Sequence, residues 1–151
     1  MSQLKDRINA DLKTAMLARD EFRTTALRGL KAAILNEEVA KGLRDEGLSD
    51  EATEQMLAKE AKKRTEAAEL FDKGGNQVSA EKERAEKVLI DAYLPEQLSE
   101  DTIQSIVNDV VADLHPEGMK DMGRVIGAVK AKTGNSANGA TVAKLVKNSL
   151  Q

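Results

Sequence analysis

The chain has 151 residues, no cysteine, a single histidine and hardly any aromatic side chains; 32% of its residues are charged, and the net charge is −3. This composition excludes disulfides, cysteine nucleophiles and metal sites that need several thiolate or imidazole ligands, so we expect neither a metal nor a cofactor. No apolar run is long enough to span a membrane and the N-terminus lacks a signal-peptide pattern, so we expect no membrane contact and a cytoplasmic location.

Residues 1–93 show the apolar periodicity of four long helices. The predicted N-caps are Asp20 for the second helix, Ser49 for the third and Ser79 for the fourth. Gly42 to Gly47 predicts a loop, and the pair at 74 and 75 ends the third helix. The side chains expected to face the core of this part include Leu4, Ile8, Leu12, Ala15, Met16, Phe22, Leu27, Leu30, Ile34, Met56, Leu57, Phe71, Val88 and Leu89.

The segment 94–98 interrupts the helical pattern, because Pro95 cannot continue a helix interior and restricts the residue before it. Ser99 then offers a cap for a new helix, and residues 99–151 read as three short amphipathic helices, the last capped by Asn138. We therefore predict an all-α protein with an N-terminal bundle of about four long helices (1–93), a linker (94–98) and a compact three-helix C-terminal domain (99–151).

Charge is distributed unevenly in the C-terminal part. Residues 93–117 carry six acidic residues and no Lys or Arg, whereas residues 118–151 carry six Lys and Arg and one Asp. Such a set of cations indicates either a solvated face or a surface that contacts the phosphates of a nucleic acid. The candidate RNA-binding residues are Lys120, Arg124, Lys130, Lys132, Asn138, Lys144 and Lys147.

Three further features leave alternatives open. Gly123 and Gly127 lie one helical turn apart, which favours close helix packing over a backbone surface that admits a phosphate or ribose. Asn138 is expected to act as a cap, although a helix start also suits an anion. A second basic cluster, interleaved with glutamates, is either a solvated face with ion pairs or an extension of an RNA surface. It consists of Lys59, Lys62, Lys63 and Arg64.

No catalytic constellation is present. His115 precedes Pro116 and reads as a helix-end residue, and no nucleophile lies in a recognisable pattern with a base. We therefore predict no catalytic residue and no independent enzymatic activity.

Several stretches carry a resemblance to a known family. Residues 119–129, 132–138 and 142–146 resemble the tail domain of the B subunit of the tRNA-dependent amidotransferases. Residues 27–34, 59–64 and 93–99 resemble stand-alone YqeY-like proteins, so the chain as a whole is similar to the GatB/YqeY family. The resemblance implies a two-domain helical protein whose tail helps to hold a tRNA, and a link to glutamine-dependent carbon–nitrogen ligases whose catalytic domain this chain lacks.

The resulting hypothesis is a non-catalytic accessory protein that interacts with tRNA or another structured RNA, and with translation-related proteins. It predicts salt-sensitive tRNA binding that charge reversal at Lys120, Arg124, Lys144 and Lys147 weakens. A second hypothesis is a protein–protein adaptor without an RNA role, for which the acidic helix after Ser99 would serve as a docking element. A third, a ligase in its own right, would require ammonia release from glutamine.

Overall fold

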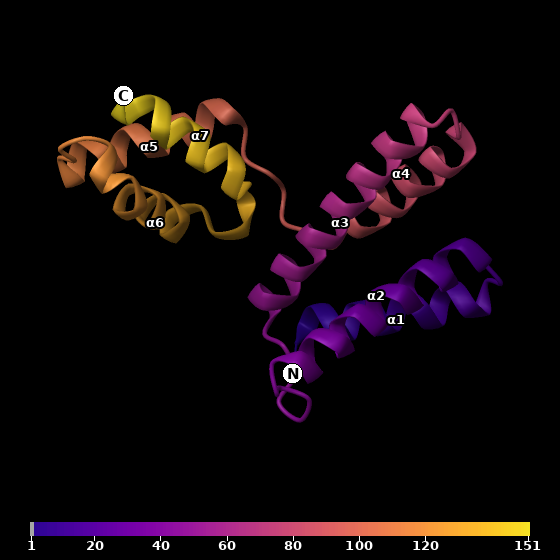
Figure 1. Ribbon diagram of the computed structural model, residues 1–151. Coiled ribbons are helices and arrows are strands. Elements are labelled where there is room, and N and C mark those ends of the chain that lie inside the picture. The colour runs from indigo at the N-terminus through magenta and orange to yellow at the C-terminus, as the bar shows by residue number, and fades with distance from the viewer. Residues whose placement is uncertain (1) are drawn as a thin grey trace. The chain divides into compact units, whose positions relative to one another are not determined.

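The computed structural model describes residues 2–151, and all regular elements among them are helical (Figure 1). The all-α prediction is confirmed. The chain divides into two compact units, Met1–Leu94 and Pro95–Gln151. Each unit has a hydrophobic core of its own.

The first unit consists of two helical hairpins that lie against each other (Figure 1). One is formed by α1 (Gln3–Leu17) and α2 (Glu21–Ala40), the other by α3 (Asp50–Lys73) and α4 (Gln77–Asp91). All four helices contribute to one core, and full burial of a leucine or isoleucine contributes about 1.5–3 kcal/mol. The most deeply buried members are Ile8, Leu27, Leu30, Ile34, Leu57 and Ile90.

Side-chain caps begin these helices, as the sequence predicted for two of them. Asp20 accepts the backbone N–H of Arg23 at 3.0 Å, and Ser49 accepts that of Ala52 at 3.1 Å. The prediction for the fourth helix is wrong, because Asn76 caps it and Ser79 lies inside it, donating its N–H to Asn76 Oδ1 at 3.1 Å. Asparagine and serine are comparably good caps, so residue type alone does not decide between these two positions.

Three side chains that were expected in the core are exposed. Met16, Phe22 and Val88 have relative exposures of 48%, 37% and 70%. Each follows the helical spacing of the buried residues around it, but lies at an edge of the apolar stripe that no neighbouring helix covers. Periodicity identifies the apolar side of a helix, while the width of the covered strip depends on its packing partners.

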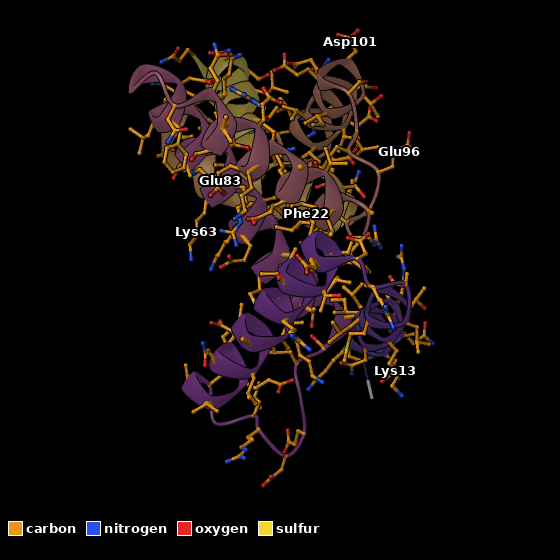
Figure 2. The ribbon with its side chains drawn as sticks, turned by 90° about the vertical axis from the view of Figure 1, so that its right-hand side faces the viewer. Lys13, Phe22, Lys63, Glu83, Glu96 and Asp101 are labelled. Atoms are coloured by element: carbon orange, nitrogen blue, oxygen red, sulfur yellow. The ribbon has the colours of Figure 1, made fainter. Side chains whose placement is uncertain are left out.

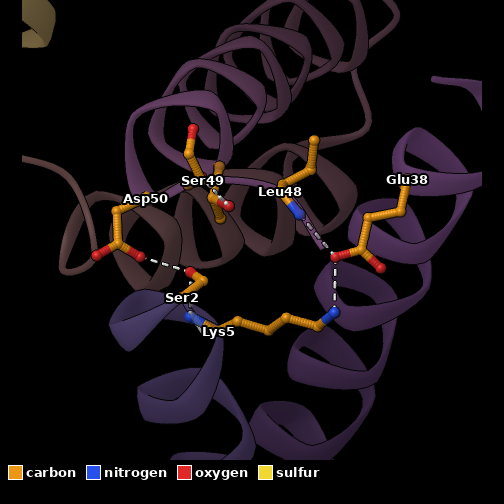
Figure 3. A network of polar contacts seen from close by, with 7 residues as sticks. Ser2, Lys5, Glu38, Leu48, Ser49 and Asp50 are labelled. Atoms are coloured by element: carbon orange, nitrogen blue, oxygen red, sulfur yellow. Dashed lines mark hydrogen bonds and ion pairs between the residues drawn. The ribbon is translucent and has the colours of Figure 1, made fainter. Parts of the chain in front are cut away.

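A polar network joins α1 to the loop between α2 and α3 (Figure 3). Glu38 is 1% exposed; its carboxylate accepts the Lys5 ammonium at 2.6 Å and the Leu48 backbone N–H at 3.1 Å. Ser2 donates its hydroxyl to Asp50 in the first turn of α3. The loop at 41–49 is thereby held by a buried charge whose partner lies 33 residues away in the sequence.

The second unit contains α5 (Glu100–Leu114), a 3₁₀ turn η1 (Met119–Asp121), α6 (Met122–Thr133), a second turn η2 (Gly134–Ser136) and α7 (Gly139–Leu150). Ser99 and Asn138 cap α5 and α7 through the N–H groups of Thr102 and Ala140, as predicted. His115 ends α5 in a left-handed conformation, with φ at 50°. The core is entirely aliphatic: Ile103, Val107, Val110, Val125, Val129, Val142, Leu145 and Val146.

The segment between the helical parts is anchored at both ends. Leu94 packs against the core of the first unit, while Leu98 packs against the core of the second and donates its N–H to the Ser136 carbonyl at 2.8 Å. Leu98 and Ile103 flank the Ser99 cap at the spacing of a hydrophobic staple, which fixes how the chain enters α5.

Candidate nucleic-acid interface

The outer face of α6 is unusual because it carries two glycines that pack against nothing. Gly123 and Gly127 are both exposed, and no atom lies within 4 Å of the position that a Cβ would take on either. The expectation that these glycines allow close helix packing is therefore wrong. Glycine inside a helix is destabilising by about 0.5–1 kcal/mol relative to alanine, so the fold alone gives no reason for them. They leave a smooth strip of helix backbone open to solvent.

Cations flank this strip. Helical spacing places Arg124 and Lys130 on the exposed side of α6, on either side of the two glycines. The Lys130 ammonium lies 3.6 Å from the position of a Cβ on Gly139, so it reaches the first turn of α7. Lys147 follows Gly139 by two spacings of four and therefore lies along the same side of α7. We call Arg124, Lys130 and Lys147 with the two glycines the glycine face.

The remaining predicted cations are distributed more widely. Lys120 forms an ion pair with Glu117, and Lys144 lies 3.9 Å from a Glu100 carboxylate oxygen. Arg124 lies 3.8 Å from Asp121 and donates to the Leu114 carbonyl at 3.2 Å. Exposed pairs of this kind contribute about 0–1 kcal/mol, so an anion can compete for these cations. Lys130, Lys132 and Lys147 form no ion pair within the described part of the chain, and Lys132 lies near the opposite edge of α6 from Lys130.

Asn138 has a structural role as the N-cap of α7. Its side-chain oxygen accepts the Ala140 N–H at 2.8 Å and starts α7, which occupies the group that a ligand would need. Any contribution to anion binding at this position comes from backbone N–H groups at the helix start.

The second basic cluster, on α3, is partly neutralised by the glutamates around it. Lys63 pairs with Glu60 at 3.1 Å, and Arg64 lies 2.9 Å from Glu86 and 3.7 Å from Glu83. Lys59 and Lys62 are exposed and have no ion pair among the described residues. The guanidinium of Arg64 is thus committed to bridging α3 and α4.

Two absences are evident in residues 2–151, the described part of the chain. No group of three or more His, Asp or Glu side chains gathers there in a way that could hold a metal ion. None of the described helices combines the length and the apolar character that crossing a bilayer requires.

Replacing the exposed glycines tests how little the fold depends on them. We expect Gly123→Ala and Gly127→Ala each to raise the free energy of unfolding by about 0.5–1 kcal/mol, because alanine loses less backbone entropy on folding and meets no neighbour. Denaturant unfolding followed by circular dichroism measures the change. Loss of stability in either variant would show that the backbone at these positions has a structural role after all.

The comparisons with known proteins agree with the resemblance to YqeY-like proteins. Three curated proteins that match are each called "Altered inheritance of mitochondria protein 41, mitochondrial". The one from Eremothecium gossypii is 37% identical over 58% of this chain and 46% of its own length. That from Lachancea thermotolerans is 31% identical over 71% of this chain and 57% of its length, and that from Kluyveromyces lactis is 29% identical over 83% and 69%. The matched region thus spans about half the length of the first two relatives.

A model of one protein family, described as "Yqey-like protein", matches residues 5–150, which include both units and the glycine face. This chain therefore belongs to the family of Yqey-like proteins.

Proposed function

We propose that this protein is a non-catalytic accessory protein that binds structured RNA, with tRNA as the favoured ligand, through the glycine face of its second unit. The likeness of this unit to the tail domain of the amidotransferase B subunit supports tRNA as the ligand. The protein would then act beside a glutamine-dependent tRNA amidotransferase or another protein of translation, and would not itself form the carbon–nitrogen bond.

The observation that carries the proposal is the pair of exposed, unpacked glycines flanked by Arg124 and by the unpaired Lys130. A helix backbone without side chains lets a phosphate or a ribose approach closely, and the Lys130 ammonium lies beside the free N–H groups at the start of α7. Phosphate contacts dominate the affinity of proteins for nucleic acids.

The composition of the second unit also selects the manner of binding. No Phe, Tyr or Trp follows Tyr93 in the sequence, so bases have no aromatic side chain to stack on. Recognition would depend on the shape of the RNA, on its phosphates and on its 2′-hydroxyl groups, which suits a folded RNA better than an unpaired strand.

Charge reversal on the glycine face tests the proposal. For Lys130→Glu combined with Lys147→Glu, we expect at least about tenfold weaker binding to bulk tRNA at low salt, and a slope of log affinity against log salt reduced by about 1.5, because two phosphate contacts are lost. Fluorescence anisotropy titrations with the full chain at several salt concentrations provide both values.

The matched control is Lys73→Glu combined with Lys82→Glu, which changes the net charge equally at two exposed positions of α3 and α4. It should leave the salt slope unchanged. Reversals at Lys120, Arg124 or Lys144 should have smaller effects, because carboxylates already lie beside these cations. Absence of binding between the unmodified protein and any tRNA at low salt would contradict the proposed function.

A protein adaptor is the second candidate, and the acidic face of α5 favours it. Glu100, Asp101, Asp109 and Asp113 are exposed there, and no Lys or Arg lies between residues 93 and 117. Affinity capture from lysate, with and without nuclease, separates the two functions. A partner retained after nuclease treatment and lost on replacing Asp109 and Asp113 by Asn would favour the adaptor.

A further inference from the structure

The turn between α1 and α2 has a feature that its counterparts lack. Three helices of the first unit end in the same hydrogen-bonding motif, in which the second residue past the helix adopts a left-handed conformation. After α2 this residue is Gly42, with φ at 70°, and after α3 it is Gly75, with φ at 77°. In α1 it is Arg19, with φ at 55°. The motif is intact, since Arg19 N–H donates to Met16 and Asp20 N–H to Ala15.

An arginine in this conformation is strained, because a left-handed backbone brings the Cβ close to the following carbonyl group. Glycine avoids the strain and is the usual residue at this position. The equivalent turns of this unit are made with glycine, so the turn itself does not require an arginine. Arg19 is exposed and forms no ion pair with any described residue.

Other polar and charged residues lie close to Arg19. Its side chain lines an open hollow of about 470 Å³ together with Met16, Glu21, Thr24, Thr25 and Arg28. Arg28 is held toward α1, with Nη2 4.0 Å from the Met16 sulfur. Two arginines and two threonines thus line one space together with a single acidic residue, Glu21. Guanidinium groups bind phosphate oxygens in pairs, and threonine hydroxyls add donors.

More positive charge lies in the same stretch of the sequence. Residues 13–31 hold five Lys and Arg against two Asp and Glu, and none of these five cations forms an ion pair within the described residues. Helical spacing places Thr24, Arg28 and Lys31 along one side of α2, and Lys13 points outward from α1 (Figure 2). On the other hairpin, Arg64, Arg84 and Lys87 are paired with carboxylates, whereas Lys59, Lys62, Lys73 and Lys82 form no ion pair with a described residue.

We propose that the α1–α2 turn binds backbone phosphates of an RNA, with Arg19 and Arg28 as the contacting residues. An open hollow, with Lys31 on the same side of α2 as Arg28, suits a chain of phosphates better than a small free anion, which would need enclosure. The inference rests on the proposed function, because it adds a second contact surface for the same class of ligand.

The test uses the full chain, bulk tRNA and the double variant Arg19→Gly, Arg28→Gln. We expect about tenfold weaker binding and a salt slope reduced by about 1.5. The single variant Arg19→Gly should bind tRNA more weakly while its thermal midpoint stays equal or rises, because glycine relieves the turn. Weaker binding together with greater stability cannot result from a damaged fold.

The matched control is Arg84→Gln, which removes an exposed but paired cation from α4 and should leave both the affinity and the salt slope unchanged. If the double variant binds tRNA with the affinity and salt slope of the unmodified protein, the inference is wrong. In that case the proposed function still stands, provided that the Lys130, Lys147 variant loses binding. Displacement of tRNA by millimolar inorganic phosphate would indicate a small-anion site and would also overturn it. Failure of the unmodified protein to bind tRNA would remove the proposed function and this inference together.

Discussion

Glu38→Ala is expected to lower the free energy of unfolding of the first unit by about 3 kcal/mol. The substitution removes the only buried acidic side chain among the described residues, leaving the Lys5 ammonium and the Leu48 N–H without their acceptor. Because Lys5 stays about one-third exposed, water compensates for part of the loss, which places the effect at the lower end for a broken buried pair.

The same carboxylate predicts a dependence on pH. The hydrogen bond from Lys5 lowers the pKa of Glu38; burial raises it, but the Leu48 N–H and the Lys5 charge lower it further, and the net shift is downward. A carboxyl whose pKa is lower in the folded state stabilises the fold above its unfolded pKa of about 4.3, and this stabilisation is lost as the pH falls through the folded value. The difference in free energy of unfolding between the unmodified protein and Glu38→Gln should therefore be largest at pH 7 and become smaller in acid.

Denaturant unfolding at several pH values measures both effects. Glu37→Ala is the matched control, because the neighbouring Glu37 pairs with Lys41 at the surface at 3.0 Å. This substitution should lower the free energy of unfolding by less than about 1 kcal/mol. Equal stability of the Glu38 and Glu37 variants would show that the buried pair contributes no more than a solvated one.

Ile103→Ala should unfold the second unit selectively. Ile103 is 2% exposed, and truncation of a buried isoleucine costs about 2–5 kcal/mol. A domain as small as residues 95–151 buries a limited apolar area and has little stability in reserve, so a loss of this size approaches its total. The core of the first unit includes none of the side chains that surround Ile103.

Calorimetry and amide hydrogen exchange distinguish local from global damage. We expect the thermal transition of the second unit to disappear or its midpoint temperature to fall sharply, while the amide protons of α1 to α4 stay protected from exchange. Ile106→Ala, at a partly buried position on the same helix, is the graded control and should have a smaller effect. Simultaneous loss of protection in both units would contradict their independent stability.

Local chemistry explains what could be predicted from the sequence. The caps at Asp20, Ser49, Ser99 and Asn138 depend on atoms within three residues, and the all-helical class follows from periodicity and composition. The buried position of Glu38 could not be foreseen, because it depends on Lys5, which meets it only after the hairpin closes. Phe22 and Val88 were misplaced for a related reason, since a stripe does not reveal which of its edges a neighbour covers.

In the candidate site, too, the residue types could be predicted from the sequence, whereas their tertiary contacts could not. The sequence identified the cations of residues 120–147, but their neutralisation by Glu100, Glu117 and Asp121 depends on how the helices and loops fold back. The glycines at 123 and 127 were visible, yet only the structure shows that nothing packs on them. The role proposed for Arg19 could not be predicted from the sequence, because neither composition nor spacing indicates a left-handed backbone at a non-glycine residue.

Each of the two interiors is lined by side chains from its own stretch of chain alone. Because neither core uses a side chain from the other stretch, we expect each stretch to keep its core when it is transplanted, duplicated or joined to a foreign protein. We likewise expect substitutions in one core to need no compensating change in the other core, so the two parts of the chain can diverge at different rates.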